Sequence, residues 1–346
     1  MSNLKIIDKL KNGQIPEKRE LVSLLDTINA DESEYLAHAA REKSLTVFGN
    51  KVYIRGLIEI SSYCKNDCFY CGLRRSNKNA VRYRLSEEQI LSCCKQGYAL
   101  GFRTFVLQGG EDGYYTDSVM CGIVSEIRKQ YPDCAITLSL GERGRESFKR
   151  LYEAGADRYL LRHETANPVH YSRLHPHGMS LEARMKSLYA LKETGFQTGA
   201  GFMVGSPYQT TENLAEDLLF IAGFKPHMCG IGPFIPHRDT PFKGMAAGSL
   251  ETTLTLLSVI RLLHPHVLLP ATTALGTIHP KGREMGILHG ANVVMPNLSP
   301  AEHRKDYSLY DNKICTGDEA AECIRCLSLR MKSIGYEIVT DRGDFK

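Results

Sequence analysis

The stretch VYIRGLIEIS at residues 52–61 runs directly into SYCKNDCFYCG at residues 62–72, and this junction decides the fold. Its first half is rich in β-branched and aromatic residues, which is typical of a buried strand. Its second half places Cys64, Cys68 and Cys71 within eight residues, in the spacing C-x3-C-x2-C. These cysteines are too close together for independent structural disulfides. The junction therefore predicts a strand whose carboxyl end carries metal or redox chemistry.

Short β-rich runs alternate with helical stretches from this junction onward. The eight strand candidates are Val52–Ile60, Thr104–Leu107, Ala135–Leu140, Tyr159–Arg162, Thr198–Val204, Met228–Ile231, Val267–Pro270 and Asn292–Met295. The clearest helix candidates are Ser86–Leu100, Leu181–Thr194, Thr211–Ala222 and Leu250–Leu263. Eight β/α units predict an α/β fold of the (β/α)8 TIM-barrel type, with the active site on the loops that follow the strands. A doubly wound open sheet is the alternative.

The periodicity divides the chain into three parts. Residues 1–50 read as an N-terminal helical cap, residues 51–297 as the barrel, and residues 298–346 as a C-terminal appendage with one helix at about residues 318–334. The 346 residues would otherwise suggest two domains, but single barrels also reach this length.

Composition excludes several classes of function. Forty-three Lys and Arg oppose 39 Asp and Glu, and we expect the resulting charge of +4 to be spread through the chain, which argues against nucleic acid as a partner. The apolar runs fall short of a membrane span, and Met1–Lys11 lacks the pattern of a signal peptide, so we expect a cytoplasmic protein with no membrane partner. Eleven cysteines in such a chain favour metal or redox chemistry.

The three cysteines match the ligand set of an open iron–sulfur cluster. Three thiolates on one loop can hold three irons of a [4Fe-4S] cube and leave the fourth without a protein ligand. Zinc, which would need a fourth ligand, and three unrelated core thiols are the alternatives. The position after the first barrel strand favours the cluster, and Gly72 would let the backbone pass close to it.

The pattern C-x3-C-x-aromatic-C, with Tyr70 before the third cysteine, resembles the signature of radical S-adenosylmethionine (SAM) enzymes. The resemblance implies that SAM binds the open iron and that an electron from the cluster cleaves it to a 5′-deoxyadenosyl radical. The turn Gln108-Gly109-Gly110-Glu111 resembles the glycine turn that receives the methionine amino group in these enzymes. Tyr70 and the four turn residues are therefore cofactor-binding candidates.

A finer resemblance, over about residues 50–326, is to the HydE family of [FeFe]-hydrogenase maturases. The stretches that carry it are CGLRR at 71–75 with RYR at 82–84, RYLLRHETANP at 158–168, TGAG at 198–201, GIGPFIPH at 230–237, PATTA at 270–274 and ANVVMPN at 291–297. The resemblance implies that the adenosyl radical attacks the sulfur of a cysteine-bound Fe(CO)2(CN) complex, a small organometallic precursor of the diiron subcluster. It also implies a reductant such as ferredoxin or flavodoxin, with the maturases HydG and HydF as possible partners.

The same resemblance assigns roles to charged residues. Glu164 would contact SAM and Arg162 would face the substrate cavity, although the two could instead form a structural ion pair. Arg184 would meet the SAM carboxylate, although a helical arginine is more often solvated. Arg55 would line the substrate cavity and favour an anionic guest, unless it pairs with Glu59.

Hydroxyl groups complete the predicted site. Thr137 and Ser139 alternate on the third strand candidate, where the family binds the adenosyl group, although a core threonine satisfied by backbone is the alternative. Thr272 and Thr273 end the seventh strand candidate and would line the substrate cavity. Tyr310 could fold over the barrel mouth and help to exclude water.

The remaining cysteines form a second set. Cys315, Cys323 and Cys326, spaced C-x7-C-x2-C, could hold an auxiliary [2Fe-2S] or [4Fe-4S] cluster, as in some HydE proteins, without a catalytic role. The other five cysteines are most simply core thiols, and no histidine is assigned to a metal.

Three other functions remain open. Methylornithine synthase shares the first loop but rearranges lysine. Biotin synthase needs more strand cysteines than this chain offers. A non-catalytic iron–sulfur carrier would leave the glycine turn and Glu164 unexplained.

Overall fold

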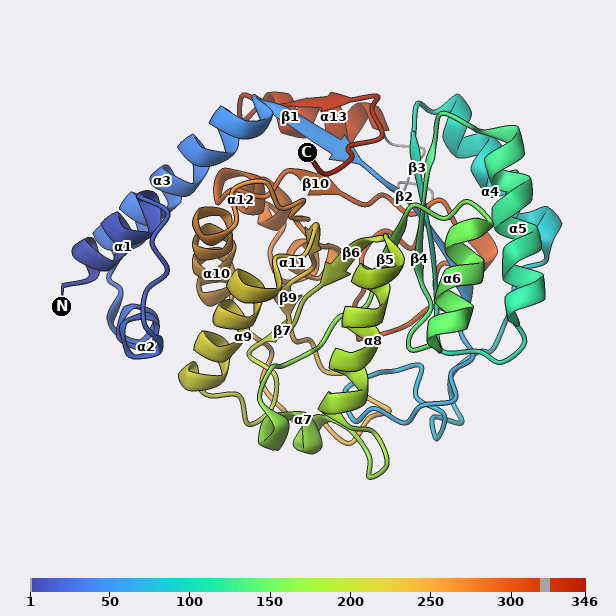
Figure 1. The fold of residues 1–346 in the computed structure, drawn as a ribbon, viewed down its shortest axis with the longest axis horizontal. Helices are drawn as coiled ribbons and strands as arrows, with labels where there is room; N and C mark the ends of the chain where they lie inside the picture. The colour runs from blue at the N-terminus through green and yellow to red at the C-terminus, as the bar shows by residue number, and fades with distance from the viewer. Residues whose placement is uncertain (1, 318–323) are drawn as a thin grey trace.

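Eight parallel strand positions close into a barrel in the computed structural model, which describes residues 2–317 and 324–346 (Figure 1). The strands of this part of the chain are β1 Lys51–Ile54, β2 Gly56–Ser61, β3 Thr104–Gly109, β4 Ala135–Ser139, β5 Arg158–Leu160, β6 Gln197–Ala200, β7 Met203–Val204, β8 Met228–Cys229, β9 Gly232–Pro233, β10 Val293–Val294 and β11 Glu337–Val339. Strands β2, β3, β4, β5, β6 and β8 form one continuous sheet. Bridges from Met228 to Leu268 and from Pro270 to Val293, and the pairing of β10 with β1, complete the ring. The predicted barrel is confirmed, and the open sheet is wrong.

Helices surround this ring. The described helices are α1 Asn3–Lys11, α2 Lys18–Thr27, α3 Ala30–Phe48, α4 Glu87–Ala99, α5 Asp117–Gln130, α6 Arg145–Glu153, α7 Pro168–Leu174, α8 Leu181–Thr194, α9 Thr211–Phe224, α10 Leu250–Leu263, α11 Thr273–Ile278, α12 Gly282–Leu288 and α13 Ile324–Lys332, with a short 3-10 turn at Ala301–His303. Local chemistry sets their ends: Ser86 caps α4 by accepting a hydrogen bond from the Gln89 amide, and Gly195 ends α8 in the left-handed conformation. Within the described residues, no helix is long and apolar enough to cross a bilayer.

The fifth predicted strand is interrupted. Thr198–Val204 is split into β6 and β7 at Gly201, whose φ is +154°. A Cβ at this position would lie 2.1 Å from the Gly230 oxygen, so only glycine permits this approach. Strand β7 then pairs with β9, so the chain turns away from the barrel ring at its carboxyl end.

The two ends of the chain lie outside the ring. Helices α2 and α3 pack against α9 and α10 along one flank. Strand β11, which the sequence analysis did not predict, pairs in parallel with β1. The following residues cover the amino end of the barrel, where the fully buried Arg158 donates to the Asp344 carboxylate at 2.6 Å. This end lies opposite the cysteine loop (Figure 1).

Candidate active site at the barrel mouth

The strand register brings the predicted site residues onto the inner face of the barrel. Glu59 pairs in register with Gln108, and Gln108 with Ser139. One layer deeper, Thr137 is in register with Arg158. Because side chains alternate along a strand, residues 59, 108, 137 and 139 share the interior side.

The cysteine loop follows β2 at this mouth. Cys64, Cys68 and Cys71 are free and partly buried. Burial raises the pKa of each thiol, to about 12 for Cys71, and the charges of Cys71 and Cys64 raise that of Cys68 further, so the three lie close together. Among the described residues, no three His, Cys, Asp or Glu side chains converge on a single ion. Three thiolates can each bind a separate iron of a cube, whereas a structural zinc site usually needs a fourth ligand.

The glycine turn packs directly against this loop. A Cβ at Gly110 would lie 2.1 Å from the Tyr63 oxygen and 2.8 Å from the Cys64 Cβ, which explains why the turn needs glycine. Glu111 accepts from the Glu142 amide at 3.0 Å and pairs with Lys65 at 3.2 Å. The Glu111 carboxylate is thus already engaged by neighbouring loops, and the backbone groups of the turn remain the feature that faces the cysteines.

Tyr70 of the cysteine loop contacts a histidine that stacks on a second tyrosine. The Tyr70 hydroxyl donates to the Nε2 atom of His175 at 3.3 Å, because the Nδ1 atom of His175 lies 2.9 Å from the Tyr171 carbonyl and must donate to it. The His175 ring stacks on the Tyr171 ring, with centroids 3.9 Å apart. The buried Tyr171 hydroxyl has no partner in the described structure. The sequence analysis missed Tyr171 and His175, which carry no motif of their own.

Arg162 and Glu164 follow β5, which ends at Leu160. Their side chains form an ion pair at 3.1 Å, as the structural alternative expected. The paired atoms are Nη2 of Arg162 and Oε2 of Glu164, and the buried Nε of Arg162 has no hydrogen-bond partner among the described residues. Glu164 also adopts a φ of +67°, which is strained for a residue with a Cβ. Strain and unsatisfied polar atoms together are typical of a ligand site.

A buried histidine and aspartate hold this strained segment. The Nε2 atom of His163 lies 3.2 Å from Oδ1 of Asp217 on α9, and the Nδ1 atom of His163 accepts from the Gly201 amide. Asp217 also accepts from the Ala166 amide at 2.5 Å. Burial lowers the pKa of His163 to about 3 and raises that of Asp217. Asp217 was missed, although an acidic residue within the apolar sequence Leu214–Ile221 was a signal for it.

Arg184 is buried rather than solvated. From α8 it reaches back to the mouth, where Nε donates to Glu142 at 2.5 Å and Nη1 donates to the Arg162 carbonyl at 2.6 Å. The alternative of a solvated helix residue is therefore wrong. Its charge acts on Cys68 and Tyr70, so it lies beside the cysteine loop, where a carboxylate ligand could meet it.

Several predicted polar residues of the barrel interior have side-chain atoms without a hydrogen-bond partner among the described residues. The buried hydroxyls of Thr137 and Thr272 have no described partner, so the alternative of a backbone-satisfied Thr137 is wrong. Arg55 does not pair with Glu59. Its Nη1 atom contacts the Met228 sulfur at 2.9 Å, while Nε and Nη2 have no described partner. Burial and the neighbouring Arg158 lower the pKa of Arg55, which places it deep in the barrel. Thr272 is the N-cap residue of α11, and Thr273 is the first residue of that helix.

Residues 304–315, which we term the lid, fold over the mouth. The Tyr307 hydroxyl lies 3.4 Å from Gln108, and Lys313 donates to the buried Glu59 at 2.5 Å. Burial raises the pKa of Tyr310 to about 12. A Cβ at Gly72 would lie 2.2 Å from the Ser308 oxygen, so this glycine admits the lid. The expectation that Gly72 also makes room for the cluster stays a prediction.

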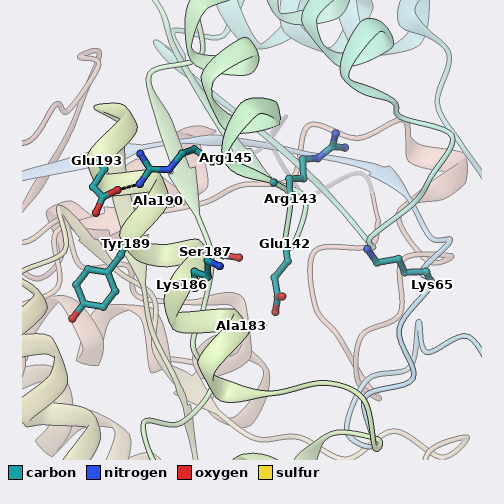
Figure 2. Close-up of a pocket in the computed structure, with 11 residues that line it drawn as sticks. Lys65, Glu142, Arg143, Arg145, Ala183, Lys186, Ser187, Tyr189, Ala190 and Glu193 are labelled. Carbon is teal, nitrogen blue, oxygen red and sulfur yellow. Dashed lines mark hydrogen bonds and ion pairs between the residues drawn. The ribbon is translucent and has the colours of Figure 1, made fainter.

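A cavity of about 750 Å³ opens beside the cysteine loop (Figure 2). Lys65 lines one side and the segment from Glu142 to Arg145 the other, with Lys186 on α8. Arg145 pairs with Glu193 across it. Its lining includes none of the predicted site residues, so this cavity lies outside the predicted SAM and substrate positions.

The second cysteine set is described only in part. Cys315 accepts from Arg283 at 3.0 Å, and Cys326 lies on α13. Cys323 lies outside the described residues, so the predicted auxiliary cluster stays a prediction.

Known proteins resemble this chain over its whole length. Residues 58–221 match the family model of the radical SAM superfamily. The [FeFe] hydrogenase maturase subunit HydE of Thermotoga maritima is 44% identical over 348 aligned positions, which cover 100% of this chain and 98% of that protein. The crystal structure of methylornithine synthase superposes with a TM-score of 0.81 at 26% identity, covering 96% of this chain and 97% of that one. The crystal structure of HydG gives a TM-score of 0.80 at 21% identity, covering 98% and 76%.

These likenesses agree with the geometry of the mouth. The family implies a [4Fe-4S] cluster and SAM, and the buried polar atoms without partners leave room for ligands of that chemistry. The higher identity to HydE than to methylornithine synthase separates the two enzyme functions that the sequence analysis left open. This chain belongs to the HydE family of the radical SAM superfamily and is a radical SAM enzyme of [FeFe]-hydrogenase maturation.

Proposed function

We propose that this enzyme cleaves SAM reductively and directs the resulting 5′-deoxyadenosyl radical to the sulfur of a cysteine-bound Fe(CO)2(CN) precursor of the diiron subcluster. The observation that supports this most strongly is the set of buried polar atoms without partners among the described residues at Arg55, Thr137, Arg162 and Thr272. Leaving such atoms unsatisfied costs about 1–3 kcal/mol each, so a barrel that keeps them is adapted to a polar, partly anionic guest.

The cofactors would occupy the upper part of the barrel. Cys64, Cys68 and Cys71 would hold a [4Fe-4S] cluster, which supplies the electron that breaks the SAM sulfonium bond. The Gly109–Gly110 backbone would orient the methionine amino group, and Arg184 its carboxylate. Tyr70, Gln108, Glu111, Thr137, Ser139 and Glu164 complete the proposed SAM contacts.

The substrate would lie beside SAM in the barrel interior. Arg55 and Arg162 present guanidinium groups from strands on different sides of the barrel, and Thr272 adds a buried hydroxyl, with Thr273 at the rim. Arginine suits cyanide or carboxylate groups because it stays charged and offers several donors. Tyr307 and Tyr310 on the lid would keep water away from the radical.

The place of the enzyme in maturation is part of the proposal. HydG would act before it and HydF after it, and an auxiliary cluster on Cys315, Cys323 and Cys326 would not be required for the main reaction. We also keep the division into residues 1–50, 51–297 and 298–346 as a proposal.

An activation assay tests the biological role. Lysates that lack this protein, HydG or HydF would each be mixed with apo-hydrogenase, and hydrogen evolution would be measured. We expect each omission to abolish activation. Adding the purified protein should restore activation in the lysate that lacks it. Activation without this protein, but not without HydG, would contradict the proposal. Equilibrium dialysis with SAM separates the enzyme from an iron–sulfur carrier, which would not bind SAM.

A further inference from the structure

The positive charge of the chain is concentrated in the sequence segment that contains the cysteine loop. Residues 63–84 contain six Lys or Arg and one Asp, a net charge of +5, whereas the rest of the chain has 37 Lys or Arg against 38 Asp or Glu. The expectation that the charge is spread through the chain is therefore wrong. The basic residues of this segment are Lys65, Arg74, Arg75, Lys78, Arg82 and Arg84.

Two of these cations hold the loop together. Arg74 forms a two-point contact with Asp67 at 2.7 and 2.9 Å, and Arg82 donates to the backbone carbonyls of several loop residues. Arg75 and Lys78 have a different role: both are exposed, and their side chains have no partner among the described residues. Maintaining the loop fold therefore does not account for their charge.

Exposed aromatic and apolar side chains lie in the same segment or contact it through Arg84. Tyr63, Val81 and Tyr114 are 37%, 58% and 55% exposed. Arg84 lies between the two tyrosine rings, 3.9 Å and 5.0 Å from their centroids, and pairs with Asp112 at 2.7 Å. Aromatic residues and arginine are enriched in protein interfaces, and Tyr63 immediately precedes Cys64.

We propose that this surface, formed by Tyr63, Arg75, Lys78, Val81, Arg84 and Tyr114, docks a small acidic electron-carrier protein. The inference rests on the proposed function, because each reductive cleavage of SAM consumes one electron that the cluster must regain from outside. The carrier would give that electron to the oxidised cluster and leave in its own oxidised form. Opposite charges would orient the encounter and speed it at low salt, as in other transient electron-transfer complexes of small area.

Binding is the first test, and it does not depend on turnover. Purified flavodoxin would be titrated into the reconstituted protein, and the Kd measured by calorimetry at 50 and 300 mM salt. We expect high salt to weaken binding, and Arg75→Glu with Lys78→Glu to raise the Kd about 10-fold or more at low salt. The control is Lys5→Glu with Lys95→Glu, which makes the same charge change at exposed positions outside the surface. Equal affinity in both double variants would overturn the proposal.

SAM cleavage with two reductants separates this inference from the proposed function. We expect Arg75→Glu with Lys78→Glu to slow 5′-deoxyadenosine release about 10-fold when reduced flavodoxin is the donor. With dithionite, which needs no docking surface, the rate should match that of the parent protein. Unchanged flavodoxin-driven rates would overturn the docking surface alone. No cleavage by the parent protein with dithionite would instead contradict the proposed function.

Discussion

Glu164 combines a strained backbone with a carboxylate that pairs with Arg162 at 3.1 Å. Its φ of +67° costs a non-glycine residue about 1–2 kcal/mol, so the chain maintains this conformation against its own stability. The clamp formed by His163 and Asp217 explains how the conformation persists, because it ties the strand end to Gly201 and to α9. The carboxylate is thereby fixed beside Arg162.

Removing the strain should separate stability from ligand binding. Glu164→Gln and Glu164→Gly both remove the charge, but glycine adopts this φ freely, so we expect Glu164→Gly to be more stable than Glu164→Gln by roughly 0.5–1 kcal/mol after its greater unfolded-state entropy is counted. Both variants should lose SAM affinity. Thermal unfolding and equilibrium dialysis check this. A less stable Glu164→Gly would contradict the strain argument.

His175 should make the metal-free protein sensitive to acid. Burial lowers its pKa to about 3, whereas in the unfolded chain it is near 6.5. Between these values only the unfolded chain binds the proton, so the free energy of unfolding falls as the pH falls, by about 2 kcal/mol from pH 6.5 to 5. We expect His175→Gln to flatten this part of the pH–Tm profile. His177→Gln, at an exposed position, is the control.

Sequence reasoning identified residues within motifs and missed those that act through another residue. Cys64, Gly110 and Arg184 lie in or near recognisable patterns, and the structure places them at one mouth. Asp217 and Lys313 come from distant parts of the chain, and only the closed barrel brings them to His163 and Glu59. Their roles depend on contacts between residues far apart in sequence, which periodicity and spacing do not encode.

One buried ion pair, between Lys313 of the lid and Glu59 of β2, fastens the lid to the barrel. Lys313 and Glu59 have side chains 8% and 1% exposed, and burial raises the pKa of Glu59 although Lys313 opposes the shift. Removing one partner of such a pair leaves the other buried without compensation, which typically costs about 3–5 kcal/mol.

Lys313→Met should therefore destabilise the protein by roughly 3 kcal/mol, and adding Glu59→Gln should recover most of that loss. Urea unfolding of the two single variants and the double variant measures the coupling. Lys305→Met, at an exposed position on the same lid, is the control. Additive effects of the two changes would show that the pair does not hold the lid.

Elements with a local signal were predicted well. Helices α8 and α10 begin and end where the sequence analysis placed them, because capping residues and apolar periodicity coincide there. Strand β11 and the break at Gly201 were not predicted. A three-residue strand carries too little pattern, and the break depends on the approach of Gly230, far along the chain.

The candidate active site and the ion pair between Arg158 and Asp344 lie at opposite ends of the barrel (Figure 1). The cysteine loop and the lid occupy the carboxyl end, while Arg342 and Asp344 close the amino end around Arg158. A change at the amino end should therefore affect stability without directly affecting the cofactor contacts.

Asp344→Ala tests this separation. It leaves the guanidinium of Arg158, which is fully buried, without its carboxylate, so we expect a loss of roughly 3 kcal/mol in stability. SAM affinity, measured at a temperature where the variant stays folded, should remain that of the parent protein. Asp341→Ala, at an exposed neighbour, should change neither quantity much. A large loss of SAM affinity in Asp344→Ala would contradict the independence of the two ends.

Three cysteine ligands would leave one iron of the cluster open for SAM. Electron–nuclear double resonance of the reduced, reconstituted protein with SAM labelled by nitrogen-15 and oxygen-17 in its methionine group measures this directly. We predict hyperfine coupling of both nuclei to the cluster, and its loss in Cys68→Ala. No coupling in a protein that holds a full [4Fe-4S] cluster, or a fourth protein ligand on that iron, would contradict the account.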